Sequence, residues 1–154
     1  MSNPHPYSSY LPTDKGLLNA EEKSLFAKHP TKGLYALSSA KTSMNYTSMY
    51  FKTNGYQDNS DAFRHSFWQA LVAHTYENSF AKQWGDAHES TSIGIDKKMD
   101  LLNNEIGRTV GSTTNGNQAI EGRIAQKLLS MIANGKLYQI QNNKLVATDS
   151  TGRK

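Results

Sequence analysis

The chain of 154 residues contains no cysteine, which excludes disulfide bonds, thiolate metal sites and cysteine nucleophiles. It also lacks an apolar run near the roughly 18 residues that a membrane-spanning helix needs, and its mean hydropathy is −0.68. Neither end carries the charged region followed by an apolar region that marks a secretory signal peptide. If the protein acts outside its own cell, we therefore expect a specialised secretion route that needs no signal peptide.

Charged residues are also scarce. Lys and Arg total 17 and Asp and Glu total 13, so the formal net charge is +4, and no segment is a basic block. Such a surplus is compatible with an anionic partner, although it serves solubility equally well. The sequence has no phosphate-binding Gly-Lys-Ser/Thr loop, no dinucleotide fingerprint and no Gly-x-Ser-x-Gly nucleophile elbow. These absences argue against the enzyme classes that depend on those motifs.

Helical spacing dominates the sequence. Apolar residues recur every three to four positions, as on one face of an α-helix, in the segments 19–29, 31–53, 60–77, 79–89, 96–111 and 117–135. The length suits one domain. We therefore predict a mainly α fold, a single compact helical domain of about six helices. Asn142-Asn143 lies between short apolar runs and allows a small C-terminal β-hairpin.

Three regions follow from this pattern. Residues 1–18 are expected to form an irregular N-terminal arm, because prolines alternate there with serine and tyrosine. Residues 19–135 form the helical domain of catalytic type. Residues 136–154 form the hairpin and a frayed tail.

Helix ends and faces can be predicted at several positions. Asn19 is expected to cap the first helix with Glu22 in a capping box, and Pro30 ends that helix near His29. Asp96 and Asn117 are the expected caps of the last two helices. In the segment 31–53 the predicted buried face consists of Leu34, Leu37, Met44 and Met49.

A first chemical motif is the pair Asp61 and His65, at positions i and i+4 of one predicted helix. Side chains with this spacing meet on the helix surface. A carboxylate beside an imidazole fixes its tautomer and raises its basicity, which suits a general base or a metal ligand. The alternative is an Asp at a helix start next to an ordinary His.

A second motif is His88-Glu89. Neighbouring residues on a helix point roughly 100° apart, so both side chains can face one narrow site only if the helix ends there. The following polar residues and Gly94 make such an end plausible. The zinc-protease pattern His-Glu-x-x-His is absent, because residue 92 is Ser.

A third motif is a polar strip on the helix predicted for 96–111, formed by Asp100, Asn103, Asn104, Gly107 and Gly111. Asp, Asn and Gly are poor helix formers, and several of them on one helix tend to mark a functional or tightly packed site. The alternative is a solvated polar face with a glycine-mediated helix contact.

Other histidines and the tryptophans suggest structural roles. His74 is expected at the core boundary with a hydrogen bond, and no role is assigned to His5 or His29. Trp68 and Trp84 are expected to fill the core or to line a cleft wall.

Together these motifs resemble an uncharacterised bacterial domain family that is similar to domains at the C-termini of Rhs-type and other polymorphic toxins. The resemblance covers roughly residues 20–115 and rests on the order and spacing of three motifs. These motifs are Asp61-Ala62-Phe63-Arg64-His65-x-x-Trp68, Ala87-His88-Glu89 and Met99-Asp100-Leu101-x-Asn103-Asn104-x-x-Gly107-Arg108. Ser66 departs from the family pattern, which has a small apolar residue there.

The resemblance implies a secreted or contact-delivered antibacterial effector that acts in a target bacterial cell. It also implies a secretion carrier or apparatus and a cognate immunity protein as partners. The residues carried over are Arg64, His65, His88, Glu89, Asp100, Asn103 and Asn104.

We expect a small hydrolase, most naturally of phosphodiester or phospholipid bonds, so that its substrate is an anionic lipid or nucleic acid. The candidate catalytic residues are His65, His88, Glu89 and Asp100. The candidate substrate-binding residues are Arg64, Trp68, Asn103, Asn104 and Arg108. His65, Glu89 and Asp100 also offer the nitrogen and oxygen ligands of a divalent cation, which would activate water.

Three alternatives stay open. A cell-wall hydrolase could use Glu89 and Asp100 as paired carboxylates, if they lie about 5–10 Å apart. A non-catalytic helical binding module would contain the same polar residues as a buried hydrogen-bond network. A membrane-perturbing toxin is the weakest alternative, because no segment is strongly apolar along its length.

Overall fold

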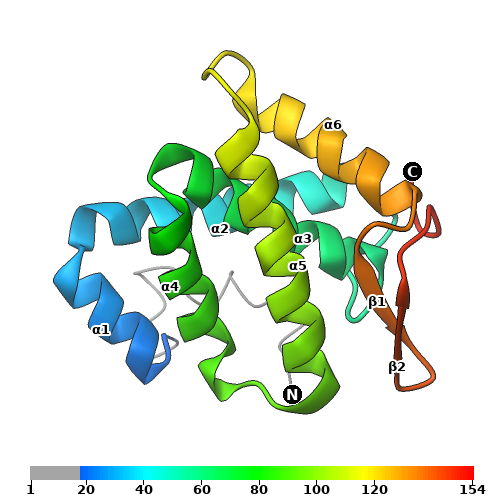
Figure 1. Ribbon diagram of the computed structural model, residues 1–154, viewed down its shortest axis with the longest axis horizontal. Coiled ribbons are helices and arrows are strands. Elements are labelled where there is room, and N and C mark those ends of the chain that lie inside the picture. Colours follow the sequence, from blue (N-terminus) through cyan, green and yellow to red (C-terminus); the bar gives the residue numbers. More distant parts are fainter. Residues whose placement is uncertain (1–17) are drawn as a thin grey trace.

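The computed structural model describes residues 18–154 of the chain, so the predicted N-terminal arm lies outside the described residues except for Leu18. The described part contains six α-helices, one short 3-10 helix and a two-stranded antiparallel hairpin (Figure 1). This confirms the prediction of a mainly α domain with a small C-terminal hairpin. Within residues 18–154, none of the helices combines the length and the apolar character that a bilayer crossing needs.

The elements follow one another with short connections. They are α1 (Ala20–Lys28), α2 (Pro30–Tyr50), α3 (Asn59–Thr75), α4 (Asn78–His88), the 3-10 helix η2 (Glu89–Thr91), α5 (Gly94–Thr113), α6 (Ile120–Ala133), β1 (Tyr138–Gln141) and β2 (Lys144–Ala147).

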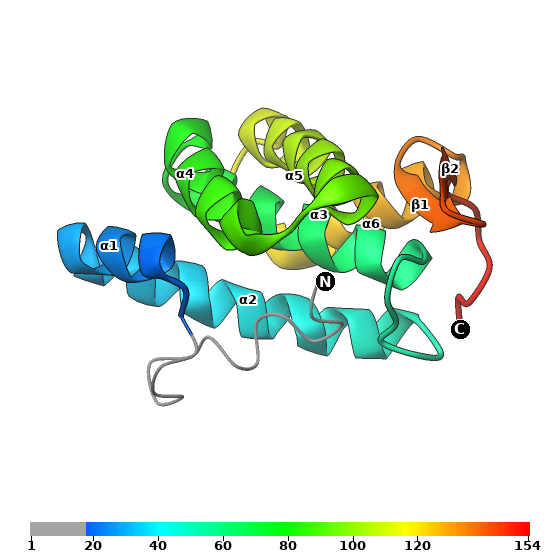
Figure 2. The same cartoon turned by 90° about the horizontal axis from the view of Figure 1, so that it is seen from below.

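Helix α3 is the centre of the domain. It packs against α2 on one side and against α4, α5 and α6 on the others, as Figure 2 shows from below. Every residue from Asn59 to Ala73 is buried. Because this helix also carries Asp61, Arg64, His65 and other polar residues, their side chains must be satisfied inside the protein.

The contact between α3 and α5 depends on two glycines. A β-carbon at Gly107 would lie 2.7 Å from Cα of Ser66, and one at Gly111 would lie 2.8 Å from Cα of Ala70. Real β-carbons do not approach a backbone so closely, so only glycine allows the two helices to pack at this distance. The polar strip of α5 is therefore buried against α3, and the alternative of a solvated face is wrong in that respect.

The buried face of α2 differs from the predicted one. Leu34 and Met49 are 51% and 57% exposed. Leu37 is buried, as predicted, but the other buried residues of the helix are small: Gly33, Ala36, Ser39, Ala40, Ser43 and Thr47. Small side chains let α2 approach α3 closely, and the Ser43 hydroxyl donates to the carbonyl of Arg64 at 2.6 Å.

Apolar packing around α3 forms two clusters. On the side of α6 and the hairpin, the rings of Phe63 and Phe67 stack with centroids 5.1 Å apart. On the side of α2 and α4, Trp68 and Trp84 are buried, and Trp68 Nε1 donates to the carbonyl of Ala36 at 2.9 Å. Both tryptophans therefore belong to the core, as one of the two interpretations predicted.

Two of the three predicted caps are wrong. Asn19 caps α1 in a capping box with Glu22, as predicted. Helix α5 instead begins at Gly94 with no side-chain cap, and the Asp96 carboxylate accepts from Tyr56 Oη at 2.5 Å. Before α6, the Oδ1 atom of Asn117 lies 2.9 Å from Nε2 of His74. In both cases the side chain that the sequence predicts as a helix cap interacts instead with a residue that is distant in the sequence.

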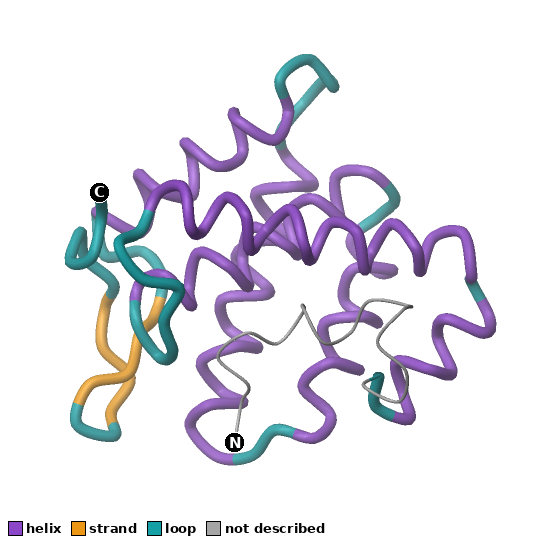
Figure 3. The backbone as a smooth tube through the Cα atoms, turned by 180° about the vertical axis from the view of Figure 1, so that it is seen from behind, coloured by secondary structure: helices purple, strands orange, loops and turns teal. Residues whose placement is uncertain are grey.

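The C-terminal segment is held by the helices. Asn142 and Asn143 have φ of 52° and 63°, the left-handed values that a tight hairpin turn requires. We expected residues 149–154 to be frayed, but Lys52 donates its backbone N–H to the carbonyl of Gly152, and Lys154 donates to that of Tyr50. Figure 3 shows this end of the chain beside the loop that follows α2.

The glycine contact can be tested with Gly107→Ala. The added methyl group forces α3 and α5 apart, so we expect a loss of about 1–3 kcal/mol in the free energy of unfolding, measured by urea denaturation. Gly122→Ala in α6 is the matched control, because nothing lies within 4 Å of its β-carbon position. There we expect a gain of up to about 1 kcal/mol from helix propensity. Equal effects at both positions would contradict the role of Gly107.

Candidate functional site

Three elements that are distant in the sequence bring their acidic and basic side chains together. His65 comes from the middle of α3, Glu89 from the start of η2 and Asp100 from the first half of α5. The Nε2 atom of His65 lies 3.6 Å from Oε2 of Glu89 and 3.5 Å from Oδ2 of Asp100. All three residues are at least 98% buried. We call these residues, together with Asp61 and His88, the His65 cluster.

Asp61 orients the ring of His65. Its Oδ1 lies 3.0 Å from Nδ1 of His65, and the backbone carbonyl of Asp61 lies 3.1 Å from the same nitrogen. Asp61 itself is held by Arg64 Nη2 at 2.5 Å and by the backbone N–H of Gln57 at 2.7 Å. The predicted pairing at i and i+4 is therefore present. Because Nδ1 faces Asp61, the ring presents Nε2 to Glu89 and Asp100.

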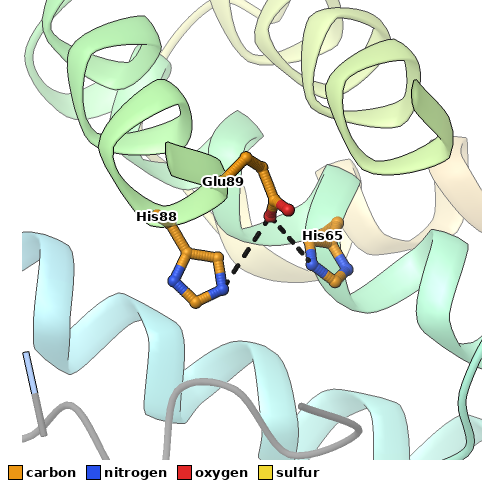
Figure 4. Close-up of side chains that lie close together, drawn as sticks. All are labelled: His65, His88 and Glu89. Atoms are coloured by element: carbon orange, nitrogen blue, oxygen red, sulfur yellow. Dashed lines mark ion pairs between the residues drawn. The ribbon is translucent and has the colours of Figure 1, made fainter. Parts of the chain in front are cut away.

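His88 and Glu89 face the same site at the end of α4. Helix α4 ends at His88, and the chain continues from Glu89 as a 3-10 turn, which is the helix end that the sequence required. Figure 4 shows the two imidazoles on either side of the Glu89 carboxylate. His88 Nε2 lies 3.8 Å from Oε2 of Glu89.

Contacts with Glu22 and Ser92 fix the orientations of His88 and Glu89. Nδ1 of His88 lies 3.2 Å from Oε2 of Glu22, which comes from α1. The Ser92 hydroxyl donates to Oε1 of Glu89 at 2.8 Å. These contacts leave the other carboxylate oxygen of Glu89 directed at the two Nε2 atoms. Oε2 of Glu89 and Oδ2 of Asp100 are buried and have no hydrogen-bond partner among the described residues.

The charges of the cluster are crowded. Burial opposes ionisation of Asp61, but the positive charges of Arg64 and His65 lower its pKa below the usual range. Burial and the neighbouring charges of Glu89 and Asp61 raise the pKa of Asp100 well above its ordinary value, although His65 acts against them.

The same charges shift the pKa values of His65 and Glu89. Burial lowers the pKa of His65, but the carboxylates of Asp100 and Asp61 outweigh it and raise that pKa well above the ordinary value. Burial raises the pKa of Glu89, but His65 and His88 lower it below the usual range. The site therefore holds more carboxylates than its cations balance.

Two of the predicted substrate-binding residues, Arg64 and Asn103, make hydrogen bonds to the backbone around the site. Arg64 is fully buried and bonds Asp61, Asn54 and the carbonyl of Gly55. Asn103 holds β1, since its side chain donates to the carbonyl of Tyr138 at 2.9 Å and accepts from the N–H of Tyr138 at 3.0 Å. Each of these residues positions the backbone around the site.

Asn104 and Arg108 belong to a second buried polar group. Arg108 Nη1 donates to Oε1 of Gln69 at 2.9 Å. A β-carbon at Gly85 would contact Gln69 Oε1 and the side-chain amide of Asn104, so these groups share one small space between α3, α4 and α5. Neither polar atom of the Asn104 side chain has a hydrogen-bond partner among the described residues.

Glu22 and Ser92 also belong to the site, although no sequence motif assigns them to it. Glu22 has a local signal, because it completes the capping box of α1 with Asn19. That signal explains its Oε1 but not its Oε2, which reaches His88 across 66 positions of sequence. No local rule predicts such a contact.

The pair Asp61–Arg64 can be tested by Asp61→Asn. This change leaves the charge of Arg64 buried without its counter-ion, so we expect a loss of about 3–5 kcal/mol in the free energy of unfolding at neutral pH. Asp86→Asn breaks an i,i+4 pair with Lys82 that is about half exposed, and should cost at most about 0.5 kcal/mol. Similar losses in the two variants would contradict the assignment.

The same variant has a pH signature. Because the pKa of Asp61 is lowered in the folded state, its stabilisation is present above its unfolded pKa, about 3.9, and is lost as pH falls through the folded value. The difference in stability between wild type and Asp61→Asn should therefore narrow below about pH 4.

Comparison with known proteins gives one match. A family model described as "Domain of unknown function (DUF6973)" matches residues 23–136. No curated protein and no solved structure matches the chain. The matched range contains the whole His65 cluster, and Glu22 lies directly before it. The expected relation to toxin C-terminal domains stays a prediction. Because the match covers most of its length, the chain belongs to the DUF6973 family.

Proposed function

We propose that the chain is a small hydrolase whose reaction centre is the His65 cluster and whose substrates contain phosphodiester or phospholipid bonds. One observation carries the proposal. A buried imidazole is oriented on one nitrogen by Asp61 and faces two further carboxylates, Glu89 and Asp100, with the other. An oriented imidazole with adjacent carboxylates is the equipment of general acid–base catalysis.

The proposed reaction is attack of water on the phosphorus or the ester carbonyl. An O–H bond of water breaks as its oxygen bonds to the reaction centre, and the carboxylate of Asp100 accepts the proton. The bond to the leaving oxygen then breaks, and that oxygen takes the proton from Asp100. Nε2 of His65 lies 3.6 Å from Oε2 of Glu89 and 3.5 Å from Oδ2 of Asp100, so the imidazole contacts both carboxylates.

The biological setting is proposed from the resemblance to toxin domains. The chain would be delivered by a secretion carrier or apparatus, act inside a target bacterium as an antibacterial toxin, and be neutralised by a cognate immunity protein in the producing cell. The formal net charge of +4 agrees with an anionic substrate, lipid or nucleic acid.

The geometry disfavours cleavage of cell-wall sugars. A glycosidase needs its two carboxyl groups about 5–10 Å apart on opposite sides of an open sugar site. Here the ring of His65 contacts both Glu89 and Asp100. These carboxylates therefore share one imidazole and do not flank an open site as the paired carboxylates of a glycosidase do.

The burial of the cluster favours a second candidate, a binding module in which the same residues specify the fold. Such a network is expected to satisfy its polar atoms, because an unpaired buried group costs about 1–3 kcal/mol. Oε2 of Glu89 and Oδ2 of Asp100, however, have no hydrogen bonds among the described residues, so these two atoms do not fit a purely structural network.

Expression in a bacterial host tests the proposal. The chain is produced in the cytoplasm or with an added periplasmic leader, and growth is compared with that of Glu89→Gln and Asp100→Asn. We expect the wild-type chain to stop growth and both variants to be harmless. Arrest only from the cytoplasm indicates nucleic acid or another cytosolic target, and arrest only from the periplasm indicates lipid. Purified protein is then assayed on an aryl phosphodiester and on anionic phospholipid vesicles.

Glu105→Gln is the matched control, since it changes an exposed carboxylate on the same helix as Asp100. The folding of all variants is followed by circular dichroism and urea denaturation. Burial and the neighbouring carboxylates raise the pKa of Asp100, so Asp100→Asn replaces a carboxyl group whose ionisation the folded protein disfavours, and it should leave stability at neutral pH unchanged or increase it while activity is lost. A fold-specifying network predicts the opposite, a loss of stability. Harmless wild-type protein together with destabilised variants would overturn the proposed function.

A further inference from the structure

We propose that the His65 cluster binds one divalent metal ion of the zinc type, held by Nε2 of His65, Nε2 of His88 and Oε2 of Glu89. The inference rests on the proposed function for the role of the ion, but not for its binding. Two histidines and one glutamate form a recurrent ligand set of hydrolytic zinc sites, in which a water molecule occupies the fourth position.

The ligand atoms have the right separation. One donor atom from each of the three residues lies within 4.8 Å of the other two, and Oε2 of Glu89 is 3.6 Å from Nε2 of His65 and 3.8 Å from Nε2 of His88. Neighbouring ligand atoms of a tetrahedral zinc ion, with bonds of about 2.0–2.1 Å, are about 3.3–3.4 Å apart. The observed distances are long for hydrogen bonds but close to the edges of such a tetrahedron.

The outer contacts are those that a metal site requires. Metal-binding histidines usually give their second nitrogen to a carboxylate, which fixes the ring and its tautomer. His65 does so with Asp61, and His88 does so with Glu22. Ser92 holds the second oxygen of Glu89. Each of the three proposed ligands is therefore held in place by a contact on the side away from the proposed ion, and the remaining donor atoms of the three ligands converge.

A second group of possible ligands is excluded by its other contacts. Asp61, His65 and Asp100 also bring donor atoms within 4.8 Å of one another. Both carboxylate oxygens of Asp61, however, are already engaged, by Arg64 and His65 on one side and by the N–H of Gln57 on the other. Asp61 is therefore a positioning residue for His65, not a ligand.

The buried oxygens of Glu89 and Asp100 support the presence of a cation. Each lacks a hydrogen-bond partner among the described residues, and Glu89 and Asp100 are only 1% and 2% exposed. A doubly charged ion balances these two carboxylates when both histidines are neutral. Asp100 Oδ2 lies 3.5 Å from Nε2 of His65 without being one of the three ligands, so Asp100 would be the base for a water molecule that the ion activates.

Metal content tests the inference without substrate. The protein is refolded with Zn²⁺, since the site is buried, and excess ion is removed by desalting before metal analysis by mass spectrometry. We expect about one zinc ion per wild-type chain, none in Glu89→Gln, and about one in Asp100→Asn, which keeps all three ligands. Replacing Zn²⁺ by Co²⁺ should give the visible absorption of a tetrahedral ion in the same proteins. The exposed-carboxylate variant Glu105→Gln should behave as wild type.

The outer contacts provide a sharper test. Glu22→Gln should weaken Zn²⁺ affinity by about 10- to 100-fold, because His88 loses the carboxylate behind it. Glu21→Gln, on an exposed position of the same helical turn, should leave the affinity unchanged. Both affinities are measured by competition with a chromophoric chelator, and circular dichroism reports whether the variants fold.

The outcomes separate this inference from the proposed function. Zinc content in folded Glu89→Gln equal to that of wild type, or loss of zinc from Asp100→Asn, overturns the ligand set. A wild-type chain that retains no Zn²⁺, Mn²⁺ or Co²⁺ after refolding overturns the metal site, even if it hydrolyses substrate. A chain that binds zinc in the expected pattern but cleaves nothing supports the site and overturns the proposed hydrolase.

Discussion

The close contact between α3 and α5 is the constraint on which the site depends. Gly107 and Gly111 let the backbone of α5 rest on the carbonyls of Ser66 and Ala70. Asp100 lies on the same strip of α5, about two turns before Gly107, so this contact brings its carboxylate to His65. A larger separation of the two helices would move Asp100 out of reach. Poor helix formers are used here because a close approach is worth more to the site than local propensity.

A second constraint is the irregular end of α4. Helix α4 ends at His88, the chain continues as a 3-10 turn, and Nε2 of His88 lies 3.8 Å from Oε2 of Glu89. Helix α1 then closes the site from outside, because Glu22 meets His88 while its other oxygen caps α1. One side chain thus couples a local helix start to a contact across the domain. The stability of α1 and the orientation of His88 are linked through this single carboxylate.

Much of this could be predicted from sequence, where the rule involved is local. The Asn19 cap, the end of α1 before Pro30, the break between α3 and α4, and the pairing of Asp61 with His65 all follow from residues within a few positions of one another. Predictions failed where a distant partner decided the outcome. The Asp96 carboxylate accepts a hydrogen bond from Tyr56, and the Asn117 side chain contacts His74, so neither caps a helix. The apolar residues Leu34 and Met49 lie exposed because α2 packs through its small residues instead.

Helix α5 itself shows how a structural polar residue differs from a functional one. Asn103 is fully buried, and both ends of its amide are satisfied by the backbone of Tyr138, so it joins β1 to α5 at no electrostatic cost. Asp100, three residues earlier, is equally buried, but it faces other carboxylates, and one of its oxygens has no hydrogen bond among the described residues. The crowding of the Asp100 and Glu89 carboxyl groups is a stability cost, and a bound cation that activates a water molecule would give this crowding a chemical use.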